Sequence, residues 1–109
     1  MYSETQISEN RREERIAAPA MVRITWRDRF GEDKFANVRS QDVSISGMRV
    51  ELPEEVPPRS YVTLQSPQLG LHGTASVRFC RAAKGRYVTG LEFTGGLKWK
   101  PKQAAKKYA

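Results

Sequence analysis

The sequence predicts a single all-β domain with about six short antiparallel strands, arranged as a barrel or a sandwich. The first observation behind this is length, because 109 residues can bury one hydrophobic core but not two. The second is the alternation of apolar and polar residues in short segments, which is the period of a strand with one buried face. The third is the recurrence of glycine, proline and other turn residues between those segments.

The first two strands are expected at residues 21–28 and 34–40, joined by a turn at residues 29–33. The pattern of the second strand is less regular than that of the first. In the first strand three apolar residues alternate with polar ones and are expected in the core: Val22, Ile24 and Trp26.

A sharp bend is expected at Ser46–Gly47. Glycine adopts positive φ angles without steric cost, so Gly47 suits a backbone corner. A change in the phase of the apolar pattern requires a tight turn or a bulge at this point. Apolar residues occupy odd positions before the bend and even positions after it: Val43 and Ile45, then Met48, Val50 and Leu52.

The fourth strand is expected at residues 61–65, between a proline-rich loop at 53–58 and a turn at 66–70. Alternating residues and flanking turn signals define it, as they define the earlier strands.

The last two strands are expected as a long hairpin at residues 71–81 and 87–94, joined by residues 82–86. The single cysteine, Cys80, is expected as a small core or edge residue of this hairpin. The core residues expected from the two strands are Val77, Phe79, Leu91 and Phe93.

Both ends of the chain differ from its centre. We expect a flexible leader at residues 1–9, a folded domain at 10–97 and a lysine-rich tail at 98–109, with a short helix from Pro101 to residue 105. A solubilising terminus is the simpler interpretation of the tail, and contact with an acidic partner or nucleic acid is the alternative. Of the 19 basic residues, five lie in the tail, which leaves 14 against 12 acidic residues elsewhere: Lys98, Lys100, Lys102, Lys106 and Lys107.

Several classes of function are disfavoured by the sequence. No apolar run is long enough to span a bilayer, and the polar start differs from a secretion signal. With Cys80 as the only cysteine, we expect no disulfide, no metal site and a cytoplasmic location. His72 is the only histidine and is expected at the surface, so an enzyme is not expected. Trp99 lies among lysines and is expected to be more exposed than Trp26, and to pack on the end of the barrel or on a partner.

Two short patterns point to a ligand. Arg11 and Arg15 form RxxxR, which a chain with twelve arginines contains about once by chance and which recurs at Arg23 and Arg27. The interval of four residues places both members of a pair on one face of a helix or strand.

The second pattern, DxSxxG, is formed by Asp42, Ser44 and Gly47 and is expected by chance only roughly 0.02 times in this composition. In this order the two patterns resemble the PilZ domain family, which has RxxxR just before its first strand and DxSxxG in the next hairpin. Residues 88–93 also resemble a late strand of that family. The resemblance extends over residues 10–94.

The resemblance implies a small six-stranded antiparallel β-barrel of PilZ type, ending in a short C-terminal helix or tail, that binds cyclic di-GMP and is not an enzyme. Family members bind one ligand or a stacked pair. The ligand-binding residues implied are Arg11, Arg15, Asp42, Ser44 and Gly47, with Arg12 and Ser46 as candidate accessories.

The chemistry of these side chains suits the ligand. The arginine fork can bond guanine O6 and N7 or a phosphate, and a carboxylate such as Asp42 can accept from the N1 and N2 donors. Ser44 can donate to a phosphate, and Gly47 permits close approach. Simpler alternatives are a solvated charged turn at the arginines and an aspartate or serine that bonds its own backbone.

We therefore expect a stand-alone receptor, monomeric or weakly dimeric, that signals to a separate protein. The N-terminal segment has little apolar content, so ligand binding is expected to order it. One alternative is a PilZ-like protein-interaction module without nucleotide binding, against which the intact motifs count. Another is a basic barrel that binds nucleic acid through its tail, against which the nearly neutral body counts.

Overall fold

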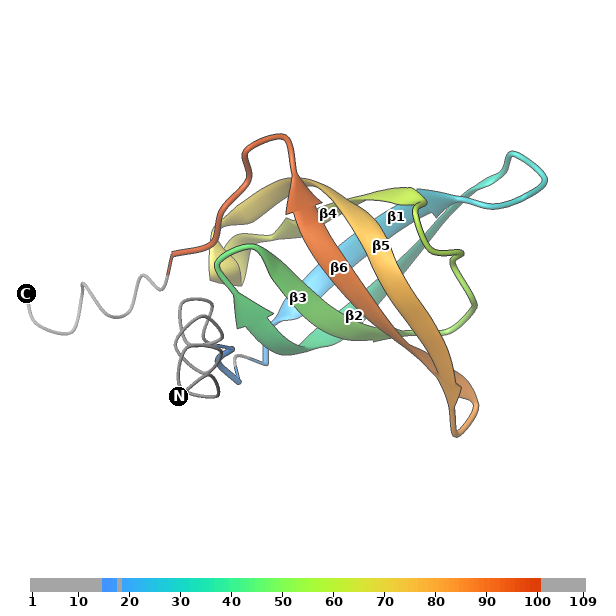
Figure 1. Cartoon of the computed structure of the whole chain (residues 1–109), viewed down its shortest axis with the longest axis horizontal. Coiled ribbons are helices and arrows are strands. Elements are labelled where there is room, and N and C mark those ends of the chain that lie inside the picture. The colour runs from blue at the N-terminus through green and yellow to red at the C-terminus, as the bar shows by residue number, and fades with distance from the viewer. Residues whose placement is uncertain (1–14, 18, 101–109) are drawn as a thin grey trace, which may run out of the picture.

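Six antiparallel strands close into a barrel in the computed structural model of this chain, which describes residues 15–17 and 19–100 (Figure 1). Neighbouring strands follow the order β1-β2-β3-β6-β5-β4, and β4 pairs back with β1. The predicted six-stranded antiparallel barrel is therefore confirmed. The strands are β1 (Met21–Arg27), β2 (Asp33–Ser44), β3 (Gly47–Leu52), β4 (Tyr61–Ser66), β5 (Leu71–Ala83) and β6 (Arg86–Thr94), with a 3₁₀ helix η1 (Pro67–Leu69) before β5.

The interior of the barrel is filled by the apolar side chains that alternate along the strands. In β1, Val22, Ile24 and Trp26 are buried, whereas the residues between them face outward or are partly exposed. Each such side chain stabilises the fold by roughly 1.5–3 kcal/mol. The core therefore forms a rigid support for the outer surface. The predicted core residues of the last hairpin that are confirmed are Val77, Leu91 and Phe93.

Several strands are longer than their patterns predicted, β2 and β5 most of all. β2 continues past residue 40 to Ser44, because a bulge between Ser40 and Asp42 absorbs the irregular pattern. The predicted connection at residues 82–86 is a tight turn at Lys84 and Gly85, whose φ angles are 50° and 81°. Two positive φ angles are typical of the hairpin turn that matches the twist of its strands.

The prediction that Phe79 lies in the core is wrong. The register between β5 and β6 shifts between Val77 and Phe79, so a bulge at Arg78 reverses the side to which the next residues point. Phe79 consequently lies partly exposed on the outside of the barrel, with its ring across Gly90. Alternation alone cannot reveal a bulge of one residue.

Two further side chains differ from expectation near the turn between β2 and β3. Ile45 was expected on the same side as the fully buried Val43, but it lies in the turn and is 42% exposed. Trp99 was expected to be more exposed than Trp26, but both are 4% exposed. Trp99 belongs to the core cluster, and Leu97 packs against that cluster from the same C-terminal segment.

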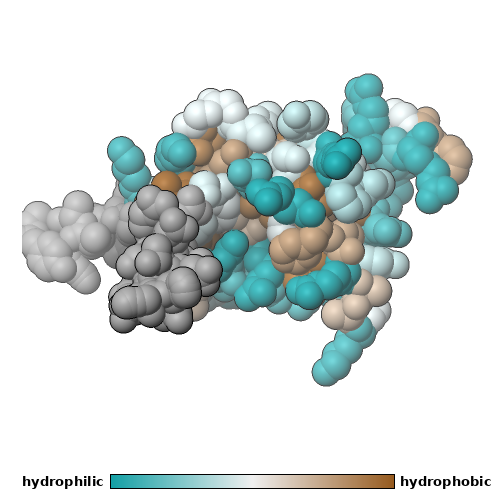
Figure 2. Space-filling model, viewed as in Figure 1, coloured by the Kyte–Doolittle hydropathy of each residue, from teal (hydrophilic) through white to brown (hydrophobic). Residues whose placement is uncertain are grey.

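The two ends of the barrel differ in shape. The β1–β2 hairpin projects to the right in Figure 1, whereas the turn between β2 and β3 lies at the left, where the chain also runs after β6. Hydrophilic side chains dominate the face seen in Figure 2, with apolar patches between them. In the described residues there is no helix with the length and apolar character of a membrane span. The expected leader at residues 1–9 and helix at 101–105 lie outside the described residues.

Candidate functional site

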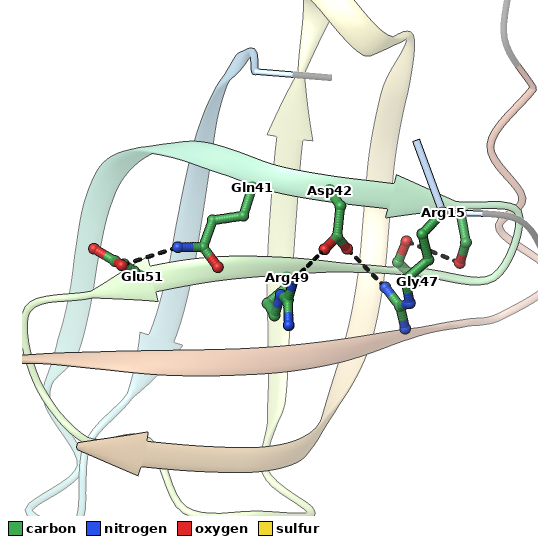
Figure 3. A network of polar contacts seen from close by, with 7 residues as sticks. Arg15, Gln41, Asp42, Gly47, Arg49 and Glu51 are labelled. Atoms are coloured by element: carbon green, nitrogen blue, oxygen red, sulfur yellow. Dashed lines mark hydrogen bonds and ion pairs between the residues drawn. The ribbon is translucent and has the colours of Figure 1, made fainter. Parts of the chain in front are cut away.

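The β2–β3 hairpin brings the DxSxxG residues onto the outer surface of the barrel. Its turn consists of Ile45 and Ser46, which places Ser44 opposite Gly47 and Asp42 opposite Arg49 (Figure 3). Since the residues between these pairs point into the core, the motif side chains point outward. The register of the hairpin thus determines the neighbours of Asp42.

Asp42 is held by two arginines (Figure 3). Arg15 Nη1 donates to Asp42 Oδ1 at 2.8 Å, and Arg49 Nη2 donates to Oδ2 at 2.6 Å. The Asp42 side chain is only 12% exposed, whereas Arg15 and Arg49 are 56% and 42% exposed. Arg49 was missed in the sequence, although a two-residue turn after Ser44 would have placed it opposite Asp42.

Arg15 is positioned by its neighbour Ile16, which forms an isolated bridge with Val43. Ile16 N donates to Val43 O at 2.9 Å, and Val43 N donates to Ile16 O at 3.0 Å. The Ile16 side chain also packs against the core, so residues 15–17 are anchored more firmly than their composition indicated. Arg11 and Arg12 lie outside the described residues, and their roles remain predictions.

Ser44 and Gly47 shape the turn itself. Ser44 is buried, and its hydroxyl donates to Gly47 O at 3.3 Å, as the simpler alternative for this serine anticipated. Gly47 does not have a positive φ, so the reason predicted for this glycine is wrong. A Cβ at Gly47 would overlap the carbonyl oxygen of Leu91, so the close approach of β6 requires glycine here.

Distant segments fasten the same turn. Phe93 N donates to Ser46 O at 2.7 Å, and Trp99 N donates to Ile45 O at 3.0 Å. Because Trp99 is buried, the C-terminal segment is tied both to the core and to the turn. Ser46, a candidate accessory, therefore contributes through its backbone carbonyl.

A surface pocket of about 400 Å³ lies beside this turn. Gly47, Gly90 and Phe79 are among its lining residues, and the Phe79 ring lies across Gly90, where a side chain would overlap it. Arg78, whose Nη1 is 2.8 Å from Glu92 Oε1, brings a second cation to the pocket besides Arg15. The lining residues are Arg15, Ser44, Ser46, Gly47, Arg78, Phe79, Gly90, Leu91 and Glu92.

The groups around the pocket suit binding of an anionic ligand with planar rings. Arginines bond phosphates and the acceptor edge of a guanine, and an aromatic ring offers a stacking surface. Neither His72 nor Cys80 lines this pocket. No group of three histidine, cysteine or acidic side chains suited to a metal ion occurs among the residues that the structure describes.

A family described as PilZ domain matches residues 9–99, which include the described Arg15, the DxSxxG hairpin and Trp99. A search of curated proteins found no match.

Proposed function

This chain belongs to the PilZ domain family, and on that premise we propose that it is a cytoplasmic receptor that binds cyclic di-GMP and signals to a separate protein. The observation that supports this best is the meeting of Arg15 and Asp42, from the two separate motifs, beside a pocket that Arg15, Ser44 and Gly47 line. The single cysteine is in keeping with a reducing compartment.

On binding, the ligand replaces Arg15 as the partner of Asp42. The N1 and N2 donors of a guanine match the carboxylate, which only accepts hydrogen bonds. Arg15 is 56% exposed, so its guanidinium has room to move, whereas Asp42 is only 12% exposed and needs a donor in its place. The guanine donors replace that bond, and the exchange frees the Arg15 guanidinium to bond a phosphate or the O6 and N7 acceptors.

Arg49 keeps Asp42 in position during this exchange. It bonds the other carboxylate oxygen at 2.6 Å and lies directly across the hairpin, so it does not compete for Oδ1. We therefore assign Arg49 a positioning role, distinct from the ligand contacts assigned to Arg11, Arg15, Asp42, Ser44 and Gly47.

The conformational change in this mechanism begins with displacement of the Arg15 side chain. Ile16 anchors the chain next to Val43, so displacement of the Arg15 side chain redirects the residues before it rather than the whole segment. Those residues include Arg11, which the resemblance assigns to the same ligand. Their closure onto the ligand alters the surface that a partner protein meets.

Calorimetric titration with cyclic di-GMP tests this function, with GTP as the ligand control. The variant Arg15→Ala is expected to weaken binding roughly 10- to 100-fold, because charge-assisted hydrogen bonds are lost. Arg23→Ala is the matched control, since Arg23 begins the second RxxxR and packs on Phe35, outside the pocket. This control is expected to bind like the wild type.

Saturable binding that is selective over GTP supports the receptor, and its stoichiometry separates one ligand from a stacked pair. Absence of heat at tens of micromolar ligand, with an unchanged melting temperature, would favour the protein-interaction module instead. Turnover of the dinucleotide by the purified protein would contradict a receptor without catalysis.

A further inference from the structure

We infer that Phe79 is a stacking surface for a purine base of the bound dinucleotide, an inference that rests on the function proposed above. It adds an aromatic contact on β5 to the residues of the two motifs. The first support is register. Asp42 lies opposite Arg49, Arg49 opposite Gly90, and Gly90 opposite Phe79, so these four residues form one row across four strands.

The row has a length that suits a ligand with two bases. Three interstrand spacings separate its ends, which is about 14 Å across the outer face. A base bonded to Asp42 lies at one end, and the pocket extends from Arg15 and Ser44 to Phe79. A second base on the same ligand can therefore reach the ring.

The position of Phe79 depends on two irregularities. The bulge at Arg78 turns Phe79 outward, and the absence of a side chain at Gly90 leaves space for its ring. A Cβ at Gly90 would overlap the ring atoms, so any other residue there would displace the aromatic group from the pocket edge. The ring is partly exposed and is not part of the core cluster.

The ring already accepts a planar cation. The guanidinium carbon of Arg81 lies 5.0 Å from the centroid of Phe79. Arg81 is exposed, so a purine can take its place or lie against it, as bases do on both aromatic and guanidinium planes. Arg78 also lines the pocket; its guanidinium bonds Glu92 at 2.8 Å and is 61% exposed, so it can bond a phosphate when it leaves Glu92.

Calorimetry with cyclic di-GMP on the full chain tests this inference through a matched set of variants. Phe79→Leu keeps an apolar group over Gly90 but removes the aromatic face, and it is expected to weaken binding roughly 5- to 100-fold. Phe79→Tyr keeps the ring and is expected to bind like the wild type. Phe35→Leu is the control, because Phe35 lies outside the core, 55% exposed, and also carries an arginine, Arg23, 4.0 Å from its centroid, yet it does not line the pocket.

Binding by Phe79→Leu within twofold of the wild type would overturn the stacking role while leaving the receptor function intact. A wild-type protein that binds no cyclic di-GMP would overturn the receptor function first and the stacking role with it. A second measurement needs no variant: the ring proton resonances of Phe79 should shift upfield on saturation with ligand. Unchanged resonances would contradict stacking even if Phe79→Leu failed to fold.

Discussion

The β1–β2 and β2–β3 hairpins lie at opposite ends of the same barrel, and they are held by different kinds of contact (Figure 1). The turn of the β1–β2 hairpin is held by bonds among its own residues, although Lys34 at the start of β2 also contacts Glu54 at 3.4 Å. Asp28 Oδ1 accepts from Phe30 N and Glu32 N, both at 2.9 Å, and Gly31 N donates to Asp28 O at 3.0 Å. Every one of these hydrogen bonds to Asp28 joins residues at most four positions apart.

The β2–β3 turn is fastened by residues that are distant in the sequence. The backbone of Phe93 bonds Ser46, and the backbone of Trp99 bonds Ile45. Next to the turn, Ile16 bonds Val43. The shape of this turn is therefore a property of the assembled barrel.

The difference bears on the function proposed above, in which the motif hairpin is both a backbone corner and a ligand site. A locally held turn keeps its shape whatever happens elsewhere, whereas a turn held from three sides changes when one of its supports moves. Arg15 is adjacent to one of these supports, Ile16, and is itself bonded to Asp42. In the function proposed above, contacts of the ligand at the β2–β3 turn would reach the N-terminal segment through the Ile16–Val43 bridge and the Arg15–Asp42 ion pair.

The largest expected effect tests the C-terminal support. Trp99→Ala should destabilise the protein by about 3–5 kcal/mol, because a buried indole is removed from the core cluster. Urea unfolding followed by circular dichroism measures this loss. Lys98→Ala, at the exposed neighbouring position, is the control and should leave stability unchanged. A Trp99→Ala variant with wild-type stability would show that the C-terminal segment does not support the turn.

The next effect compares the glycines of the two hairpins. Gly47→Asn should cost about 3 kcal/mol or more, since the new Cβ overlaps the backbone carbonyl of Leu91, which cannot move aside easily. Gly31 has a φ of 83° and nothing within 4 Å of its Cβ position. Gly31→Asn should therefore cost less than about 1 kcal/mol, because asparagine tolerates this backbone conformation.

Thermal and urea unfolding of the two asparagine variants decides the comparison. Equal losses of unfolding free energy in the two variants would mean that close packing at Gly47 is no more restrictive than the positive φ of Gly31. In the expected case, Gly47→Asn also weakens cyclic di-GMP binding, whereas Gly31→Asn leaves it unchanged.

The difference between local contacts and contacts of residues distant in the sequence also explains which features the sequence alone could predict. Alternation in β1 and β6 identified core residues such as Trp26 and Leu91, because side-chain direction along a strand is a local property. The motif hairpin was also located, because its pattern is short and contiguous. These features need no knowledge of which strands are neighbours.

The features that the sequence did not predict depend on pairing between strands and on tertiary packing. Arg49 becomes a partner of Asp42 only through the hairpin register, and Phe79 becomes part of the pocket only through the bulge at Arg78. Trp99 is buried although lysines flank it, because burial is decided by tertiary packing rather than by neighbours in the chain. Gly47 was predicted correctly as a required glycine, but for a local reason instead of the contact with β6.

A smaller, pH-dependent effect is expected in the β1–β2 hairpin. The backbone N–H of Glu32, with lesser contributions from Phe30 N–H and the positive charges of Lys34 and Arg29, holds the pKa of Asp28 below its ordinary value against partial desolvation. Since the pKa is lower in the folded state, the unfolded chain takes up the proton first as pH falls. Stability from this carboxylate is therefore present near neutral pH and is lost as pH falls below about 4.

Urea unfolding between pH 3 and pH 7 checks this dependence with the variant Asp28→Asn. The wild type should be slightly more stable at pH 7, and the difference should shrink toward pH 3. Asp33→Asn is the control in the same hairpin, because Asp33 pairs with Arg27 in full exposure at 3.2 Å. A difference that grows on acidification would contradict the assignment. Neither variant should alter cyclic di-GMP binding.

The smallest expected effect lies at the tip of the β1–β2 hairpin. Phe30 is 82% exposed, and Phe30→Ser should change the free energy of unfolding by less than about 0.5 kcal/mol. Its backbone N–H bonds Asp28, and serine retains that donor; its ring has the exposed Arg29 guanidinium 5.9 Å from its centroid, a contact that serine loses. Unfolding and cyclic di-GMP titration of this variant should both match the wild type. A weaker affinity of this variant for cyclic di-GMP would mean that a change at the β1–β2 hairpin alters the β2–β3 turn. It would contradict the view that the two hairpins are held independently.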